Sequence, residues 1–200
     1  MDDKSYQEKV KNWNLRDDYK KDLDVISLFT NYCLSKNVSK DLYIIGTGLG
    51  ADIDSIIEFT KLKSITGIEP ITSFFESASP KYKNLNAKIF NLKLSEFVAK
   101  NDTLSGIFIF SYSINHIPED ELLEFKKSLR KSFLIILNPN PEFPKRFWWT
   151  DETILHYFSG DEISKLLNCE KVYDFFYNFV EIENKTIFVR NAVVLKTKDF

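Results

Sequence analysis

The sequence predicts an α/β fold: a doubly wound, mostly parallel sheet that is covered by helices on both faces and closed by an antiparallel hairpin. Two observations support this prediction. Short, continuously apolar segments alternate with amphipathic segments as far as residue 138, which is typical of parallel strands buried between helices. The last two strand-like segments are separated only by Glu183-Asn184-Lys185, a connection that permits a hairpin and is too short for a helical crossover.

The predicted elements follow one another in a regular order. Residues 2–21 are charged and are interpreted as a short helix or arm, and the apolar residues from Leu23 to Leu34 recur at helical spacing. The predicted strands cover residues 42–45, 64–69, 87–90, 106–110, 133–137, 171–182 and 186–196. The predicted helices between them cover residues 53–60, 71–79, 119–131 and 160–167, and Pro80 is expected to end the second of these.

Length and composition restrict the class of protein. A chain of 200 residues with 44% apolar and 28% charged residues is long enough for one domain with a real core. Its formal net charge of −2 provides no basic field for nucleic acid, and Cys33 and Cys169 have no metal-ligand spacing. The polar start and the short longest apolar run, 133–137, argue against a signal peptide and a membrane span. We therefore expect a cytoplasmic protein that binds neither nucleic acid nor membrane.

A glycine-rich turn follows the first predicted strand. In Gly46-Thr47-Gly48-Leu49-Gly50, the glycines allow a tight turn and a close approach of the backbone to a ligand, because no Cβ atom stands in the way. The next helix begins there and offers free N–H groups, and Asp52 and Asp54 are interpreted as acids favoured by its dipole. The alternative is a tight turn that binds no ligand.

A single acid ends the second predicted strand. Glu69 follows the first glycine by some twenty residues, which is where a carboxylate in a doubly wound sheet accepts hydrogen bonds from ribose hydroxyl groups. A carboxylate there would also repel a 2′-phosphate. Taken alone, Glu69 could equally be a solvent-exposed residue at a strand end. Together with the glycine turn, it predicts a ligand that contains adenosine.

The order of four segments gives the chain a family resemblance. The glycine turn and Gly67-Ile68-Glu69-Pro70 are followed by Phe110-Ser111-Tyr112-Ser113-Ile114-Asn115-His116-Ile117 and by His156-Tyr157-Phe158-Ser159. With its leading segment and its closing hairpin, the chain resembles the class I S-adenosylmethionine-dependent methyltransferases over most of residues 20–197. That family has a seven-stranded sheet in which the last strand runs against the others.

The resemblance implies S-adenosyl-L-methionine as the cofactor, S-adenosyl-L-homocysteine as the product, no metal, and a small-molecule acceptor methylated at oxygen or nitrogen. It also implies a single domain with an N-terminal helical arm or lid at 1–35, a cofactor-binding half at 40–138 and an acceptor-side part at 139–200. The implied cofactor contacts are Gly46, Thr47, Gly48 and Gly50 with the methionine part, Glu69 with the ribose, Pro70 or Ile71 with the adenine, and Asn91, Leu92 and Lys93 with the adenine edge. Ser111 and Tyr112 are implied to face both the sulfonium and the acceptor.

The sequence departs from the family pattern at two places. Ile44 stands two residues before the first glycine, where the family usually has an acid. The turn after the third strand, 91–93, lacks the acid that is often found there. Two alternatives therefore stay open: a catalytically silent module of the same fold that binds a protein partner, and a nicotinamide-binding protein, because the glycines also fit GxGxxA.

Methyl transfer from a sulfonium is an in-line displacement with an activated leaving group, so alignment of the reactants suffices and no protein nucleophile is required. His116 is the candidate base for an acceptor that must lose a proton, and a capping or packing role is the alternative. The residues expected to contact the acceptor are Trp13, Tyr19, Asn115, Trp148, Trp149, His156 and Tyr157, with packing against the sheet or under a loop as the alternative.

Overall fold

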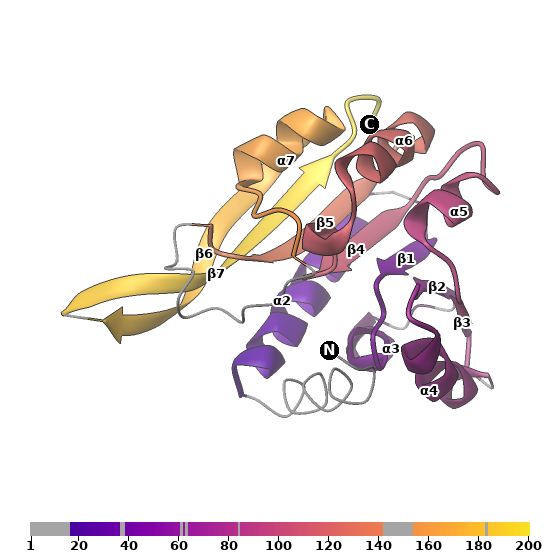
Figure 1. Ribbon diagram of the computed structural model, residues 1–200, viewed down its shortest axis with the longest axis horizontal. Helices are drawn as coiled ribbons and strands as arrows, with labels where there is room; N and C mark the ends of the chain where they lie inside the picture. Colours follow the sequence, from indigo (N-terminus) through magenta and orange to yellow (C-terminus); the bar gives the residue numbers. More distant parts are fainter. Residues whose placement is uncertain are drawn as a thin grey trace.

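The computed structural model describes residues 17–36, 39–60, 62, 64–83, 85–141, 154–182 and 184–200. Within these ranges, seven strands form one sheet in the order β3-β2-β1-β4-β5-β7-β6 (Figure 1). The strands are β1 Leu42–Ile45, β2 Ile65–Ile68, β3 Ala87–Phe90, β4 Ile107–Ser111, β5 Phe133–Pro139, β6 Glu170–Ile182 and β7 Lys185–Lys196. The first five strands are parallel, and β7 pairs antiparallel with both β5 and β6. The predicted sheet with its closing hairpin is confirmed.

Helices cover both faces of this sheet (Figure 1). One face carries α2 Asp17–Leu34, α3 Ala51–Thr60 and α4 Thr72–Tyr82, and the other carries α5 Leu94–Val98, α6 Glu119–Ser128 and α7 Gly160–Leu167. A 3-10 helix, η1 Ile114–His116, follows β4. The helices that precede β3 therefore lie on one face and those that follow it lie on the other, which makes the fold doubly wound.

The inner strand β5 shows why both faces need helices. All seven of its residues are buried. Phe133, Ile135 and Leu137 pack in the hydrophobic cluster beneath α2, α3 and α4, whereas Leu134 and Ile136 pack in the cluster beneath α5, α6 and α7. Successive side chains of a strand point to opposite faces, so a continuously apolar strand is stable only between two apolar layers.

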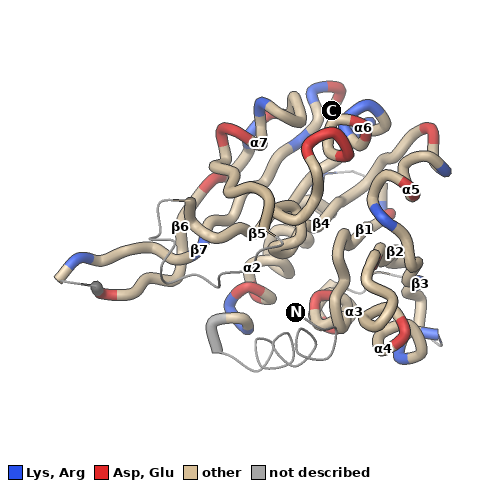
Figure 2. Tube along the Cα trace, viewed as in Figure 1, with Lys and Arg blue, Asp and Glu red and all other residues tan. Residues whose placement is uncertain are grey.

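The outer surface shows how the charged and terminal residues are arranged. The first turn of α6 carries three acids and its last turn carries Lys126 and Lys127, an order that complements the helix dipole (Figure 2).

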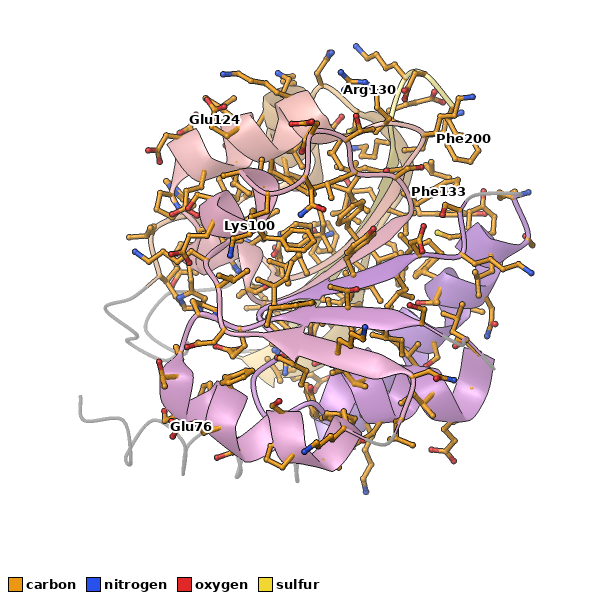
Figure 3. All side chains as sticks on the ribbon, turned by 90° about the vertical axis from the view of Figure 1, so that its right-hand side faces the viewer. Glu76, Lys100, Glu124, Arg130, Phe133 and Phe200 are labelled. Atoms are coloured by element: carbon orange, nitrogen blue, oxygen red, sulfur yellow. The ribbon has the colours of Figure 1, made fainter. Side chains whose placement is uncertain are left out.

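The ring of the C-terminal residue Phe200 packs against Phe133 at the start of β5, with the ring centroids 4.7 Å apart (Figure 3). The last residues of the chain thus close the end of the sheet that lies opposite the strands' carboxyl ends.

Two of the predicted helices have a different C-terminal end in the structure. Pro80 does not end α4, which continues to Tyr82. A proline in the last turn removes a single backbone N–H, and the Tyr82 hydroxyl group holds this turn by donating to the Gly50 carbonyl oxygen at 2.7 Å. In the other case α6 ends at Ser128 rather than at residue 131, because Leu129 forms a bridge with Leu104.

The closing hairpin extends beyond the rest of the sheet (Figure 1). β5 pairs with β7 only over residues 190–196, so residues 185–188 of β7 pair with β6 alone. The projecting part exposes aromatic side chains, of which Phe179 is the most exposed at 63%. Among the described helices, none combines the length and the apolar composition required to cross a bilayer.

Candidate functional site

The turn between β1 and α3 has the backbone that its glycines predict. Gly46, Gly48 and Gly50 have φ angles of +75°, +52° and +89°, a region in which residues with a side chain are strained. The Gly46 N–H donates to the carbonyl oxygen of Ile68 at 2.8 Å, and the Gly50 N–H donates to that of Thr47 at 2.9 Å. The turn is therefore tied both to itself and to the end of β2.

The three glycines differ in what surrounds them. A Cβ atom added at Gly46 would lie 2.6 Å from the Cβ atom of Ser113, and one added at Gly50 would collide with the Tyr82 ring. By contrast, nothing lies within 4 Å of a Cβ atom added at Gly48. Gly46 and Gly50 thus permit close packing within the protein, whereas Gly48 faces open space.

Glu69 lies directly beside this open position. Its side chain is buried, with 2% of its surface exposed. Oε2 accepts a hydrogen bond from the Gly48 N–H at 2.7 Å, and Oε1 accepts one from the Ile71 N–H at 2.9 Å. Burial raises the pKa of Glu69 to about 7, although these two hydrogen bonds act in the opposite direction. The alternative of an exposed acid at a strand end is wrong, and each carboxylate oxygen retains a lone pair for a further donor.

Asn91, which follows β3, holds the backbone around Glu69. Its Nδ2 atom donates to the Glu69 carbonyl oxygen at 2.8 Å and to that of Pro70 at 3.3 Å, and its Oδ1 atom accepts from the Thr72 hydroxyl group at 3.2 Å. Pro70 is exposed, and Leu92 is half-buried against the cluster beneath α5 and α6. The structure therefore brings Asn91 and Pro70 together with Glu69 at the carboxyl ends of β2 and β3.

A second group of polar side chains lies at the end of β4. Tyr112, directly after this strand, has a φ angle of +59°, an unfavourable value for a residue with a side chain. Ser111 hydrogen-bonds the buried carboxylate of Asp52, which also accepts from the Tyr19 hydroxyl group at 2.9 Å. Desolvation is the largest influence on this acid and raises the pKa of Asp52 to about 6. Tyr19, Asp52 and Ser111 thus link α2, α3 and β4.

Asp22 occupies a neighbouring buried position and has a cation beside it. Its carboxylate accepts from the hydroxyl groups of Tyr112 at 2.9 Å and Tyr177 at 2.7 Å, and it lies 3.6 Å from the Nε atom of Arg190. The Arg190 guanidinium stands 4.9 Å from the centroid of the Tyr112 ring. Asp22 and Arg190 have at most 1% of their side chains exposed. This network fixes the side chain of Tyr112 toward α2.

The segment after η1 supplies the remaining predicted residues. The carbonyl oxygen of Asn115 accepts from the N–H groups of Leu155 at 2.9 Å and His156 at 3.3 Å, so the structure joins η1 to the segment that precedes α7. His156 stacks on Phe158 at 4.9 Å between ring centroids. His116, the last residue of η1, and Tyr157 are both half-buried. Trp13, Trp148 and Trp149 lie outside the described residues.

Sequence reasoning missed the buried network of Asp22, Asp52 and Arg190. One signal was available for Arg190, because it is the only charged residue between Lys185 and Lys196 in a predicted strand. Asp22 offers a weaker signal, since it lies one position before the apolar stripe of α2. Neither pattern identifies its partner, because the partners are far apart in the chain.

Several solved structures that share this arrangement are methyltransferases. The chain is similar to an S-adenosylmethionine-dependent methyltransferase from Archaeoglobus fulgidus, with a TM-score of 0.63 and 16% identity over 78% of this chain and 86% of that one. It is also similar to the 1,6-didemethyltoxoflavin-N1-methyltransferase of Burkholderia thailandensis, with a TM-score of 0.70 and 14% identity over 98% and 85% of the two chains. The protein has the class I methyltransferase fold. No protein-family model and no curated protein matches the sequence.

The methyltransferase fold is also shared with the N-methyltransferase NodS from Bradyrhizobium japonicum WM9, solved in complex with S-adenosylhomocysteine. That structure aligns with a TM-score of 0.65 and 14% identity over 93% of this chain and 91% of that chain. In this fold the glycine turn and Glu69 lie at the carboxyl edge of the sheet, beside the point where the strand order reverses between β1 and β4.

The residues at this edge fit an adenosyl ligand. Gly48 faces open space beside a buried carboxylate that can accept two further hydrogen bonds. Within this turn and against it, the buried Oγ1 of Thr47 and Oγ of Ser113 have no hydrogen-bond partner among the described residues. Buried polar atoms without partners are uncommon in proteins, and they are accounted for when a ligand completes the site.

Proposed function

We propose that the protein is an S-adenosylmethionine-dependent methyltransferase that acts on a small-molecule acceptor. The observation that carries the proposal is the pairing of Glu69 with the open glycine turn at Gly48. It occurs in a fold whose solved examples include a complex with S-adenosylhomocysteine and one with that product and 1,6-didemethyltoxoflavin, a small molecule.

The ribose and adenine of the cofactor would be held at the ends of β2 and β3. The Glu69 carboxylate would accept hydrogen bonds from the ribose hydroxyl groups, and the turn from Gly46 to Gly50 would border the methionine part. Pro70 and Leu92 would provide apolar contacts for the adenine. Asn91 acts mainly by holding the backbone of Glu69 and Pro70 in place through its side-chain amide.

Bound S-adenosylmethionine supplies a methyl group that is already activated by the positive sulfur. The chain's own residues therefore need to align the acceptor and exclude water, and alignment alone can supply on the order of 7–11 kcal/mol in favourable cases. Ser111, Tyr112 and Asn115 are the residues we assign to the acceptor side, with Tyr19, His156 and Tyr157 around them. His116 is the candidate proton acceptor for a hydroxyl or ammonium substrate.

Calorimetry tests this proposal directly. The protein should bind S-adenosylmethionine and S-adenosylhomocysteine, and Glu69→Ala should lose several-fold or more in affinity, since each net hydrogen bond contributes roughly 0.5–1.5 kcal/mol. Glu76→Ala is the matched control, because Glu76 is exposed on the neighbouring helix α4 (Figure 3). Absence of binding at millimolar cofactor would refute the proposal and favour a catalytically silent module, and a thermal shift with NAD alone would favour a nicotinamide-binding protein.

A further inference from the structure

Asp52 is a buried carboxylate without a positive partner. Only 4% of its surface is exposed, and its hydrogen bonds come from the hydroxyl groups of Tyr19 and Ser111. Among the residues that the structure describes, no basic side chain forms an ion pair with it. The neighbouring acid Asp22 provides the contrast, because it is equally buried and has Arg190 beside it.

A buried carboxylate in this environment is energetically unfavourable unless a cation pairs with it. Buried charges in proteins are ordinarily paired, because two neutral hydrogen bonds do not replace the hydration that a carboxylate loses. The positive end of α3 lies close to Asp52, but a helix dipole is a weaker influence than full desolvation. Although burial raises the pKa of Asp52 to about 6, the group is still mainly ionised at pH 7.5. The structure thus holds an uncompensated negative charge.

The position of Asp52 indicates which part of a ligand it faces. β1 lies between β2 and β4 in the sheet. Glu69 follows β2, whereas Asp52 contacts Ser111 at the end of β4, so the two carboxylates lie on opposite sides of the glycine turn. A ligand whose ribose is held by Glu69 and that crosses this turn brings its other end toward Asp52. In S-adenosylmethionine and S-adenosylhomocysteine, that end is an amino acid.

We propose that Asp52, oriented by Tyr19 and Ser111, recognises the α-ammonium group of the bound cofactor. The inference rests on the proposed function and goes beyond it, because it assigns a residue to one charged group of the ligand.

The test compares two ligands that differ by one group. S-adenosylhomocysteine and its deamino analogue, in which hydrogen replaces the ammonium group, are titrated into the unmodified protein and into Asp52→Asn at pH 7.5. The unmodified protein should bind S-adenosylhomocysteine about 10- to 100-fold more tightly than the analogue, as expected for a charge-assisted hydrogen bond. Asp52→Asn should lose that preference and keep its affinity for the analogue, which also shows that the variant is folded.

Asp54→Asn is the matched control. Asp54 lies in the same first turn of α3, but it is exposed and paired with Lys81, so both ligands should bind this variant as they bind the unmodified protein. Equal affinity of the unmodified protein for the two ligands, or an equal loss of both in Asp52→Asn, would overturn this inference and leave the proposed function standing. If the unmodified protein binds neither ligand, the proposed function itself is refuted.

Discussion

Replacing Glu69 by glutamine tests the physical state of the acid at the centre of the site. The folded protein holds Glu69 with a pKa of about 7 because the side chain is buried, whereas the same group has a value of 4.5 when it is not perturbed. Between these two values the folded state keeps a proton that the unfolded state has released. Stability contributed by this proton is therefore fully present at low pH and is lost as the pH rises toward 7.

The size of the change in stability follows from the difference between the two pKa values of Glu69. Each pH unit between the two pKa values changes the free energy of unfolding by about 1.4 kcal/mol. From pH 5 to pH 8 the free energy of unfolding of the unmodified protein should fall by about 3 kcal/mol because Glu69 loses its proton. The free energy of unfolding of Glu69→Gln should not fall by this amount. The glutamine amide also faces a backbone N–H and forfeits a hydrogen bond, which lowers the stability of the variant by about 1–3 kcal/mol at every pH.

Urea denaturation followed by circular dichroism at pH values from 5 to 8 measures both effects. The stability of Glu69→Gln relative to the unmodified protein should rise steadily with pH, so that a variant that is less stable at pH 5 becomes comparable at pH 8. Glu76→Gln, on the exposed face of α4, should give a curve parallel to that of the unmodified protein. Parallel curves for Glu69→Gln as well would refute the conclusion that Glu69 is desolvated.

Three further substitutions test other features of the structure. Gly48→Ala should lower the free energy of unfolding by about 1–2 kcal/mol, because the backbone at this position is left-handed. Calorimetry should show that its cofactor affinity falls at least ~10-fold, because the added methyl group fills the open space. Unchanged affinity would contradict the assignment. Arg190→Ala should lower the free energy of unfolding in urea by about 3–5 kcal/mol by leaving Asp22 buried without a cation, and a loss below about 1 kcal/mol would show that the pair is unimportant. Ser159→Ala removes the cap that accepts from the Glu162 N–H, so its thermal midpoint should fall by about 2–4 °C, and an unchanged midpoint would argue against the cap.

Local patterns predicted most of the fold, because the elements concerned carry their signal within a few residues. The strand at 133–137 is continuously apolar, and the helix beginning at Gly160 follows a serine and places a glutamate at its third position. The helix α5 was missed because five residues are too few to show a helical period. The end of α4 was predicted wrongly at Pro80, because the Tyr82 hydroxyl group anchors the turn that follows this proline through a contact the local sequence does not show.

The predicted and the unpredicted parts of the site differ in the same way, since only the predicted parts carry their signal within a local stretch of sequence. The glycine turn and the place of Glu69 beside it could be predicted because they depend on backbone geometry and on a fixed spacing between neighbouring strands. The group around Asp22 could not, because its partner Tyr177 is 155 residues away in the chain. Whether a charged residue is buried and what it contacts depends on tertiary packing, which a single sequence does not show.

The contacts of Asp22 have a consequence for how the protein is made. Tyr177 and Arg190, which hold Asp22, are translated at least 155 residues after it. Contacts of such high sequence separation cannot form until both segments have been synthesised. Tyr112, whose hydroxyl group binds the same carboxylate, therefore gains its full set of contacts only after β7 has been synthesised, and a nascent polypeptide that ends before β7 lacks part of the polar group beside the end of β4.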